Sequence, residues 1–191
     1  MKQRIIAFWL VAFVAIVHVS AQESTNRPAI WARKIDIAGV GNCYQVTTNL
    51  YRGAQPTAEG MKHLKALGIR TVVNLRSFHS DKQKISGTGL RGMRFEAKPW
   101  HADLNEVVGF LKVAADTNNL PVFVHCERGA DRTGLMCAMY RICICDWPKN
   151  DAIAEMKQGG FNFSPVWSEL VSFIERSDIA DIKRRMLLAG K

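Results

Sequence analysis

One cysteine and one arginine, Cys126 and Arg132, are separated by five residues between an apolar stretch and a helix-like segment. Residues 122–124 predict a buried strand, and from Leu135 onward apolar residues recur at helical spacing. A turn between a strand end and a helix start can aim several backbone N–H groups at one point, where a phosphate dianion binds. Arg132 can hold two phosphate oxygens at once, and the same field favours a thiolate at Cys126. The stretch therefore predicts a nucleophile and an anion site in one loop.

The run from His125 to Thr133 matches the His-Cys-x5-Arg-Ser/Thr signature, so the chain resembles the cysteine-dependent protein tyrosine and dual-specificity phosphatases. The resemblance implies that Cys126 attacks phosphorus, that Thr133 assists the later departure of its sulfur, and that His125 orients the loop. It also implies that the phosphate is held by the Arg132 side chain and by loop amides of Glu127, Arg128, Gly129, Ala130, Asp131 and Arg132. A buried structural cysteine and a rhodanese-type sulfurtransferase are the alternatives, but the arginine spacing and the following threonine fit the latter less well.

A general acid is the third group that this chemistry needs. The resemblance implies an aspartate from the loop that follows the strand predicted at residues 93–97, and Asp103 is the candidate. Asp103 followed by Glu106 is also a capping-box pattern at a helix start, which requires no catalysis. Both roles can coexist, and Glu106 and Asp131 are the alternative acids.

The elements that must position these residues alternate along the chain. Residues 49–76 look like the N-terminal half of atypical dual-specificity phosphatases, most closely the periplasmic tyrosine phosphatases of Gram-negative bacteria of the TpbA type. We expect a single α/β domain with a mainly parallel central sheet flanked by helices, and the anion site at the carboxyl end of the central strand. The predicted strands are 43–46, 50–52, 69–76, 93–97 and 122–124; helices are predicted to begin after Thr57, Asp103, near Arg132, at Asp151 and after Ser164, with a loop over 77–90.

The N-terminus has a pattern typical of export. Lys2 and Arg4 precede an apolar run over residues 5–17, and the small residues of Val19-Ser20-Ala21 suit a signal peptidase. We therefore expect a signal peptide over residues 1–21, an N-terminal arm over 22–41, a phosphatase domain over 42–191, and a periplasmic or secreted protein. The alternative is an uncleaved anchor, which would be the only membrane contact and would leave the domain facing the periplasm.

The composition limits the classes of partner and cofactor that we expect. The sequence holds 26 Lys and Arg against 17 Asp and Glu, a net charge of +9, but the basic residues are scattered and do not interleave with aromatic residues as in a nucleic-acid groove. We expect no nucleic-acid partner. The five cysteines lack the spacing of a zinc site or a disulfide framework, and the expected chemistry uses arginine and amides, so we expect neither a metal nor a cofactor.

The substrate class follows from the loop between cysteine and arginine. The resembling inositol phosphatases tend to carry several lysines there, whereas this loop has Glu127, Arg128 and Asp131. Two carboxylates disfavour a highly phosphorylated ring, so a phosphorylated protein is the expected partner, with phosphotyrosine first and phosphoserine or phosphothreonine open. A phosphoinositide or inositol phosphate phosphatase and a non-catalytic phosphoprotein-binding pseudophosphatase are the alternatives.

Overall fold

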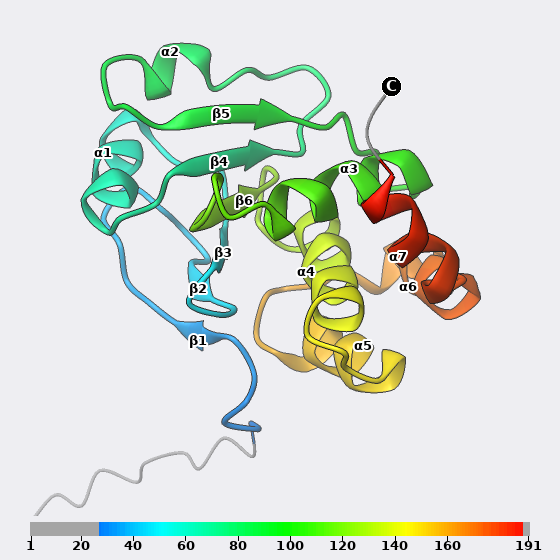
Figure 1. Cartoon of the computed structure of the whole chain (residues 1–191). Coiled ribbons are helices and arrows are strands. Elements are labelled where there is room, and N and C mark those ends of the chain that lie inside the picture. The colour runs from blue at the N-terminus through cyan, green and yellow to red at the C-terminus, as the bar shows by residue number, and fades with distance from the viewer. Residues whose placement is uncertain (1–26, 189–191) are drawn as a thin grey trace, which may run out of the picture.

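A computed structural model describes residues 27–188, which form a mixed, mostly parallel sheet covered by helices on both faces (Figure 1). The predicted signal segment lies outside the described residues. Within them the sheet has six strands in the order β1-β2-β3-β6-β4-β5. The strands are β1 (Arg33–Lys34), β2 (Tyr44–Gln45), β3 (Leu50–Gly53), β4 (Thr71–Asn74), β5 (Arg91–Arg94) and β6 (Val122–His125).

The parallel part of the sheet places β6 at its centre. β6 pairs in parallel with β3 on one side and with β4 on the other, and β5 continues the parallel order beyond β4. β1 and β2 are antiparallel additions at the β3 edge. All four residues of β6 are buried, as are those of β4, because helices cover both faces there. The predicted α/β fold with a mainly parallel sheet is therefore confirmed.

The helices divide into two groups by the face they cover. The helices are α1 (Ala58–Ala66), α2 (Lys82–Ile85), α3 (Leu104–Ala115), α4 (Asp131–Cys143), α5 (Lys149–Gln158), α6 (Ser168–Arg176) and α7 (Ile179–Leu187). Successive strand residues point to opposite faces. Val72 and Phe123 accordingly pack in a cluster with α1, whereas Val73, Val122 and Val124 pack in the larger core formed with α3 to α7. No helix within residues 27–188 is long and apolar enough to span a membrane.

Several local predictions need correction. The predicted loop over 77–90 contains the short helix α2, and the strand expected at 93–97 lies at Arg91–Arg94, where it is in register with β4. The strand expected at 69–76 is limited to Thr71–Asn74. Pro165 begins a 3-10 turn before α6, and the side chain of Ser164 makes no capping hydrogen bond. Part of the predicted arm forms β1, which is too short and polar to show a strand pattern in the sequence.

Candidate active site

The site is built where β6 ends and α4 begins. Cys126 follows β6 directly and is 2% exposed, and the loop turns within four residues into α4. Gly129 has φ +69, and a Cβ placed on it would lie 2.3 Å from the carbonyl carbon of Gly53. The loop therefore needs glycine at this position, because it lies directly against the end of β3.

Four successive carbonyl groups of this loop accept hydrogen bonds from other parts of the chain. The Glu127 carbonyl accepts from the Gln55 backbone N–H at 3.0 Å, and the Arg128 carbonyl accepts from Asn42 Nδ2 at 2.9 Å. Arg52 donates from Nη2 to the carbonyls of Gly129 and Ala130, at 2.8 and 3.2 Å.

These contacts fix the direction of the amide groups. In a trans peptide the N–H points away from the C=O of the same unit, so the N–H groups of residues 128–131 point away from the partners of the four carbonyls. Among the described residues we find no hydrogen-bond acceptor for these four amides. The start of α4 adds the positive end of a helix dipole. This is the arrangement that an amide-lined phosphate site requires.

Arg132 connects the loop to a cleft. Its Nη1 lies 3.4 Å from the carbonyl oxygens of both Leu75 and Ala97, which follow β4 and β5. Arg132 and Glu127 line a cleft of about 200 Å³ together with residues from the segments after β4 and β5: Arg76, Ser77, Phe78, His79, Pro99 and Trp100. The Glu127 carboxylate is 65% exposed and lies 3.7 Å from Arg76 Nη2.

Comparison with known proteins places this geometry in a family. Residues 38–164 match the family described as DSP-PTPase phosphatase fused to NAD+ kinase. The chain is 33% identical over 174 residues to the dual specificity protein phosphatase TpbA of Pseudomonas aeruginosa, covering 89% of this chain and 77% of TpbA. A crystal structure of TpbA in complex with pTyr matches with a TM-score of 0.74 and 29% identity, covering 84% of this chain and 98% of that one.

The chain belongs to the dual-specificity phosphatases. It is also 26% identical over 162 residues to inositol diphosphatase DSP3 of Arabidopsis thaliana, covering 79% of this chain and 77% of the relative. The enzyme is thus a cysteine-dependent phosphatase by family, and the predicted resemblance is confirmed.

The predicted acid lies at the start of α3. Asp103 Oδ1 accepts hydrogen bonds from the N–H groups of Asn105, at 2.7 Å, and Glu106, at 3.3 Å, so its predicted capping role is confirmed. Asp103 is three residues after Trp100, which lines the cleft. Burial, followed by the negative charges of Asp103 and Glu96, raises the pKa of Glu106. The roles of Asp103 as general acid and of Glu106 as the alternative acid stay predictions.

The remaining predicted residues have distinct surroundings. Asp131 is occupied by structural contacts, because Oδ2 is 3.0 Å from Arg128 Nη2 and Oδ1 accepts from the Ser164 N–H at 2.8 Å. The Thr133 hydroxyl is fully buried and has no hydrogen-bond partner among the described residues, and its role at the sulfur stays a prediction. His125 Nδ1 lies 3.0 Å from the carbonyl oxygen of Cys126.

Two residues behind the loop were missed by the sequence reasoning. Arg52 is 1% exposed, and its guanidinium lies 3.8 Å from the centre of the Phe161 ring. Asp81 is 7% exposed and lies 2.7 Å from His125 Nε2. The partners are 77 and 44 residues apart in the sequence, so no local pattern could have found them.

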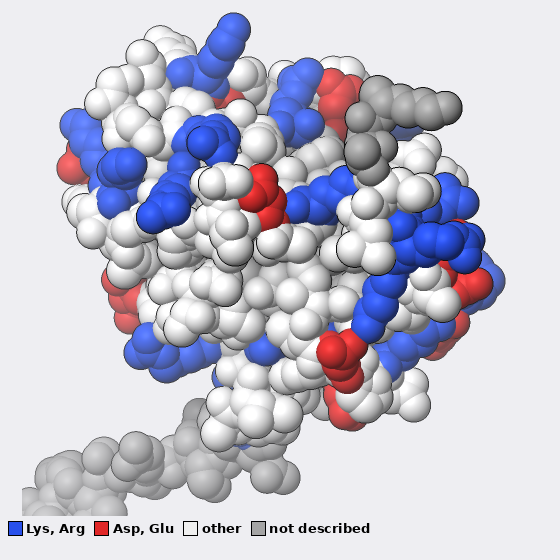
Figure 2. All heavy atoms as spheres, in the orientation of Figure 1, with Lys and Arg blue, Asp and Glu red and all other residues white. Residues whose placement is uncertain are grey.

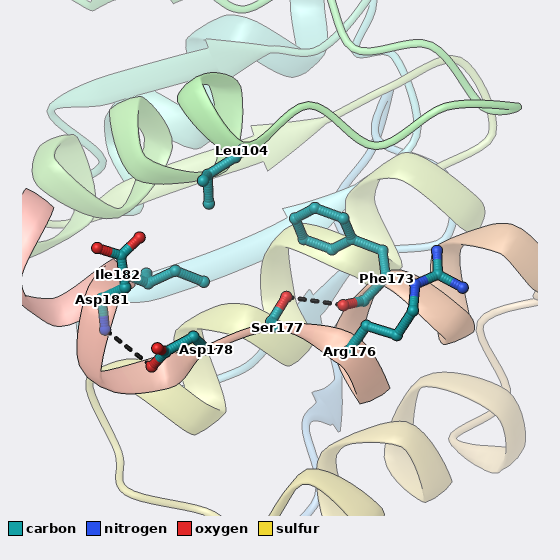
Figure 3. A pocket seen from close by; sticks show the side chains of 7 residues that line it. All are labelled: Leu104, Phe173, Arg176, Ser177, Asp178, Asp181 and Ile182. Atoms are coloured by element: carbon teal, nitrogen blue, oxygen red, sulfur yellow. Dashed lines mark hydrogen bonds between the residues drawn. The ribbon is translucent and has the colours of Figure 1, made fainter.

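A larger cavity elsewhere has no comparable chemistry. About 270 Å³ lies between Leu104 at the start of α3 and the chain from Phe173 to Ile182 (Figure 3). Its polar groups are engaged in helix-end hydrogen bonds and ion pairs: the Ser177 hydroxyl donates to the Phe173 carbonyl, Asp178 accepts from the Asp181 N–H, and Arg176 pairs with Glu169. Within residues 27–188 no group of three or more His, Cys, Asp or Glu side chains is arranged to hold a metal ion.

Proposed function

We propose that this dual-specificity phosphatase hydrolyses phosphotyrosine in proteins through a phosphocysteine intermediate. The proposal rests on two exposed aromatic side chains that line the cleft beside Arg132. Phe78 is 92% exposed and Trp100 63% exposed, and both line this one cleft from different segments. Large exposed apolar side chains that gather at one site indicate a binding surface, and flat aromatic side chains suit the ring of phosphotyrosine. The binding of pTyr by TpbA supports the same substrate class.

The first step transfers the phosphoryl group to the enzyme. The Cys126 thiolate attacks phosphorus, and the bond from phosphorus to the ester oxygen breaks. Asp103 gives its proton to that oxygen, so the substrate leaves as a neutral tyrosine hydroxyl. Arg132 and the loop amides hold the phosphoryl oxygens and stabilise their charge in the transition state.

The second step releases phosphate. A water molecule attacks phosphorus and loses a proton to the Asp103 carboxylate, while the phosphorus–sulfur bond breaks. The Thr133 hydroxyl donates a hydrogen bond to the departing sulfur, which leaves as a thiolate. Phosphate then dissociates, and both Cys126 and Asp103 have returned to their starting protonation states.

Inositol phosphates are the second candidate, because a relative at 26% identity is an inositol diphosphatase. The exposed carboxylate of Glu127 in the cleft disfavours a ring that carries several phosphates, since like charges repel. On the face of the molecule in Figure 2, Lys and Arg occur in several separate groups with Asp and Glu among them. This face therefore shows no continuous basic stripe of the kind that follows a nucleic-acid backbone.

The decisive assay is phosphate release from a phosphotyrosyl peptide, with an inositol polyphosphate as the competing substrate and with reductant and EDTA present. We expect turnover of the peptide that survives EDTA and is lost in Cys126→Ser. Turnover of the inositol polyphosphate alone would move the function to the second candidate. Tight peptide binding by both proteins without turnover would indicate a phosphoprotein-binding pseudophosphatase.

The aromatic wall can be tested by itself. We expect Phe78→Ala and Trp100→Ala each to raise KM for the phosphotyrosyl peptide by about tenfold, because each removes apolar contact with the ring. The KM for a phosphoseryl peptide should change less. Ile30→Ala, at an exposed position outside the cleft, is the matched control. Equal effects on both peptides would contradict the role given to the ring.

We also propose that residues 1–21 direct export to the periplasm, with membrane contact only if the segment stays uncleaved. The support is the charged start and apolar run of the sequence. N-terminal sequencing of the protein from the periplasmic fraction should begin at Gln22. A protein that begins at residue 1 and sediments with membranes would indicate the anchored form.

A further inference from the structure

We propose that Asp81 is a positioning residue that holds His125 as a doubly protonated imidazolium behind Cys126, where its charge stabilises the reactive thiolate. The inference rests on the proposed role of Cys126 as nucleophile. It assigns a function to a residue in the segment between β4 and β5, which the signature around Cys126 does not contain.

Asp81 occupies the N-cap position of α2 but does not cap this helix with its side chain. It immediately precedes α2, a position where aspartate side chains commonly accept hydrogen bonds from the first helical N–H groups. Its side chain makes no such bond. Instead Oδ2 lies 2.7 Å from His125 Nε2, and Oδ1 accepts from Gln55 Nε2 at 2.7 Å. The buried carboxylate is thus directed into the site rather than to its helix.

The partners of His125 determine how many protons its ring carries. Nδ1 lies 3.0 Å from the Cys126 carbonyl, and Nε2 lies 2.7 Å from the Asp81 carboxylate. A carbonyl and an ionised carboxylate only accept hydrogen bonds, so both ring nitrogens must donate. A ring with two N–H groups is a cation. The one other arrangement that satisfies both contacts moves the shared proton to Asp81 and leaves both groups neutral.

Two neighbours other than His125 favour the ionised form of Asp81, because Gln55 donates a hydrogen bond to the carboxylate and the positive charge of Lys84 lowers its pKa. Burial raises the pKa of Asp81, but this effect is outweighed by the hydrogen bond and charge of His125, the hydrogen bond from Gln55 and the charge of Lys84. The pKa of Asp81 therefore lies below its ordinary value. Lys84, on α2, donates to the Pro56 carbonyl, and Gln55 is neutral. Phe123 lies against the ring of His125, with centroids 6.0 Å apart.

The consequence for Cys126 is electrostatic. The Nδ1–H of the imidazolium is directed at the backbone carbonyl of Cys126, so the positive group of the ion pair contacts the residue that carries the nucleophile and Asp81 lies on the other side of the ring. A positive charge within a few ångströms lowers the pH at which a thiolate forms, by about 1–3 units for an unopposed charge. Because Asp81 partly cancels the charge, we expect an effect of about one unit here.

Asp81→Asn separates charge from hydrogen bonding. The Asn amide can donate to a neutral Nε2 while Nδ1–H still donates to Cys126, so the contacts remain and the charges vanish. Nitrogen NMR of the His125 ring should show two N–H groups in the unchanged protein at pH 7 and one in the variant. Glu59→Gln, an exposed carboxylate on α1, is the control and should keep both.

The reactivity of Cys126 gives a second readout that needs no substrate. Alkylation by iodoacetamide follows the thiolate, and burial raises the pKa of Cys43 to about 12 and of Cys137 and Cys143 to about 11. The pH at which Cys126 reacts, followed by mass spectrometry, should be higher by about one unit in Asp81→Asn than in the control.

A single N–H on His125 in the unchanged protein at pH 7 would overturn the proposal, since the proton would then reside on Asp81. An unchanged alkylation profile in folded Asp81→Asn would overturn the effect on Cys126. If the variant does not fold, the NMR of the unchanged protein still decides. Neither measurement depends on phosphatase turnover, so failure of the proposed function would be seen separately.

Discussion

Replacement of Arg52 by methionine tests whether Arg52 fixes the direction of the peptide groups that line the phosphate site. The side chain is buried, donates to the carbonyls of Gly129 and Ala130, and contacts the face of Phe161. A hydrogen bond from a charged group contributes about 1.5–3 kcal/mol, and a desolvated cation–π contact about 2 kcal/mol. Removal of a buried, unpaired charge returns part of this energy. We expect Arg52→Met to lower the free energy of unfolding by about 2–4 kcal/mol.

The effect on catalysis should be larger than the loss of stability suggests. Without Arg52 the Gly129 carbonyl loses its donor and can rotate, and the N–H group of Ala130 rotates with it, whereas the Ala130 carbonyl still accepts from the Gly134 N–H at 2.7 Å. Loss of one preorganised donor to a transition-state oxyanion costs about 10²–10³ in rate, so we expect kcat/KM to fall by at least about 100-fold. Arg52→Lys keeps the charge but has no planar group that can donate to two carbonyls. Its kcat/KM should therefore lie between those of the unchanged protein and Arg52→Met.

Urea unfolding and steady-state kinetics with a phosphotyrosyl peptide measure the two effects, and inhibition by inorganic phosphate reports the anion site itself. Arg33→Met is the matched control, because Arg33 is exposed on the edge strand β1 and bonds only to Gln45 among the described residues. If folded Arg52→Met retains kcat/KM and phosphate affinity within twofold of the control, Arg52 does not orient the loop and the reasoning is refuted.

Three further predictions concern the loop, the acid and pH. Gly129→Ala should cost about 3 kcal/mol or more and abolish phosphate binding, whereas Gly68→Ala, also at positive φ but with open space around it, should cost only about 1 kcal/mol in the same unfolding assay. Asp103→Asn should lower kcat about 100-fold for phosphotyrosine, and much less for an activated aryl phosphate whose leaving group needs no protonation. The kcat of Glu106→Gln should stay within about threefold of the unchanged protein. The reverse order of effects would make Glu106 the acid. Because the pKa of Asp81 is lowered on folding, its stabilisation is present above the unfolded value near pH 4 and lost as the pH falls through the lower, folded value. The stability deficit of Asp81→Asn should therefore be seen at pH 6 and shrink toward pH 3 in urea unfolding, and a constant deficit would contradict the ion pair.

The sequence could predict the features whose signals are local. Five residues separate Cys126 from Arg132, the strand before them is a continuous apolar run, and apolar residues recur at helical spacing after them. Asp103 was predicted to cap α3 from its spacing to Glu106, and the bonds at 2.7 and 3.3 Å confirm the cap. Short elements were harder: α2 has four residues and β1 two, and neither is long enough to display a period.

Asp81 and Arg52 could not be predicted because their environment is made by the sheet. Asp81 occurs in a polar segment where the sequence favours a solvent-exposed loop. Only the packing of that segment, with α2 against α1 and β5, buries Asp81 against His125. Arg52 belongs to β3, and its inward direction follows from the pairing of β3 with β6. A charged residue inside a predicted strand, or an acid beside a catalytic loop, gives no sign of its partner until the strand order is known.

The phosphate site is therefore a product of the whole parallel sheet rather than of the signature alone. The signature supplies the nucleophile and the arginine, and Gly129 between them allows the loop to turn. The direction of its amides, however, is set by donors from elsewhere: Asn42 before β2, Arg52 on β3 and the backbone of Gln55 after it. Because these donors belong to the neighbouring part of the sheet, a sequence that kept the signature but lost them would retain the thiol and lose the anion site. Substitution of Asn42 and Arg52, whose donors are side chains, should therefore weaken phosphate binding while the signature itself stays intact. The Gln55 donor is a backbone N–H, which a side-chain substitution leaves in place.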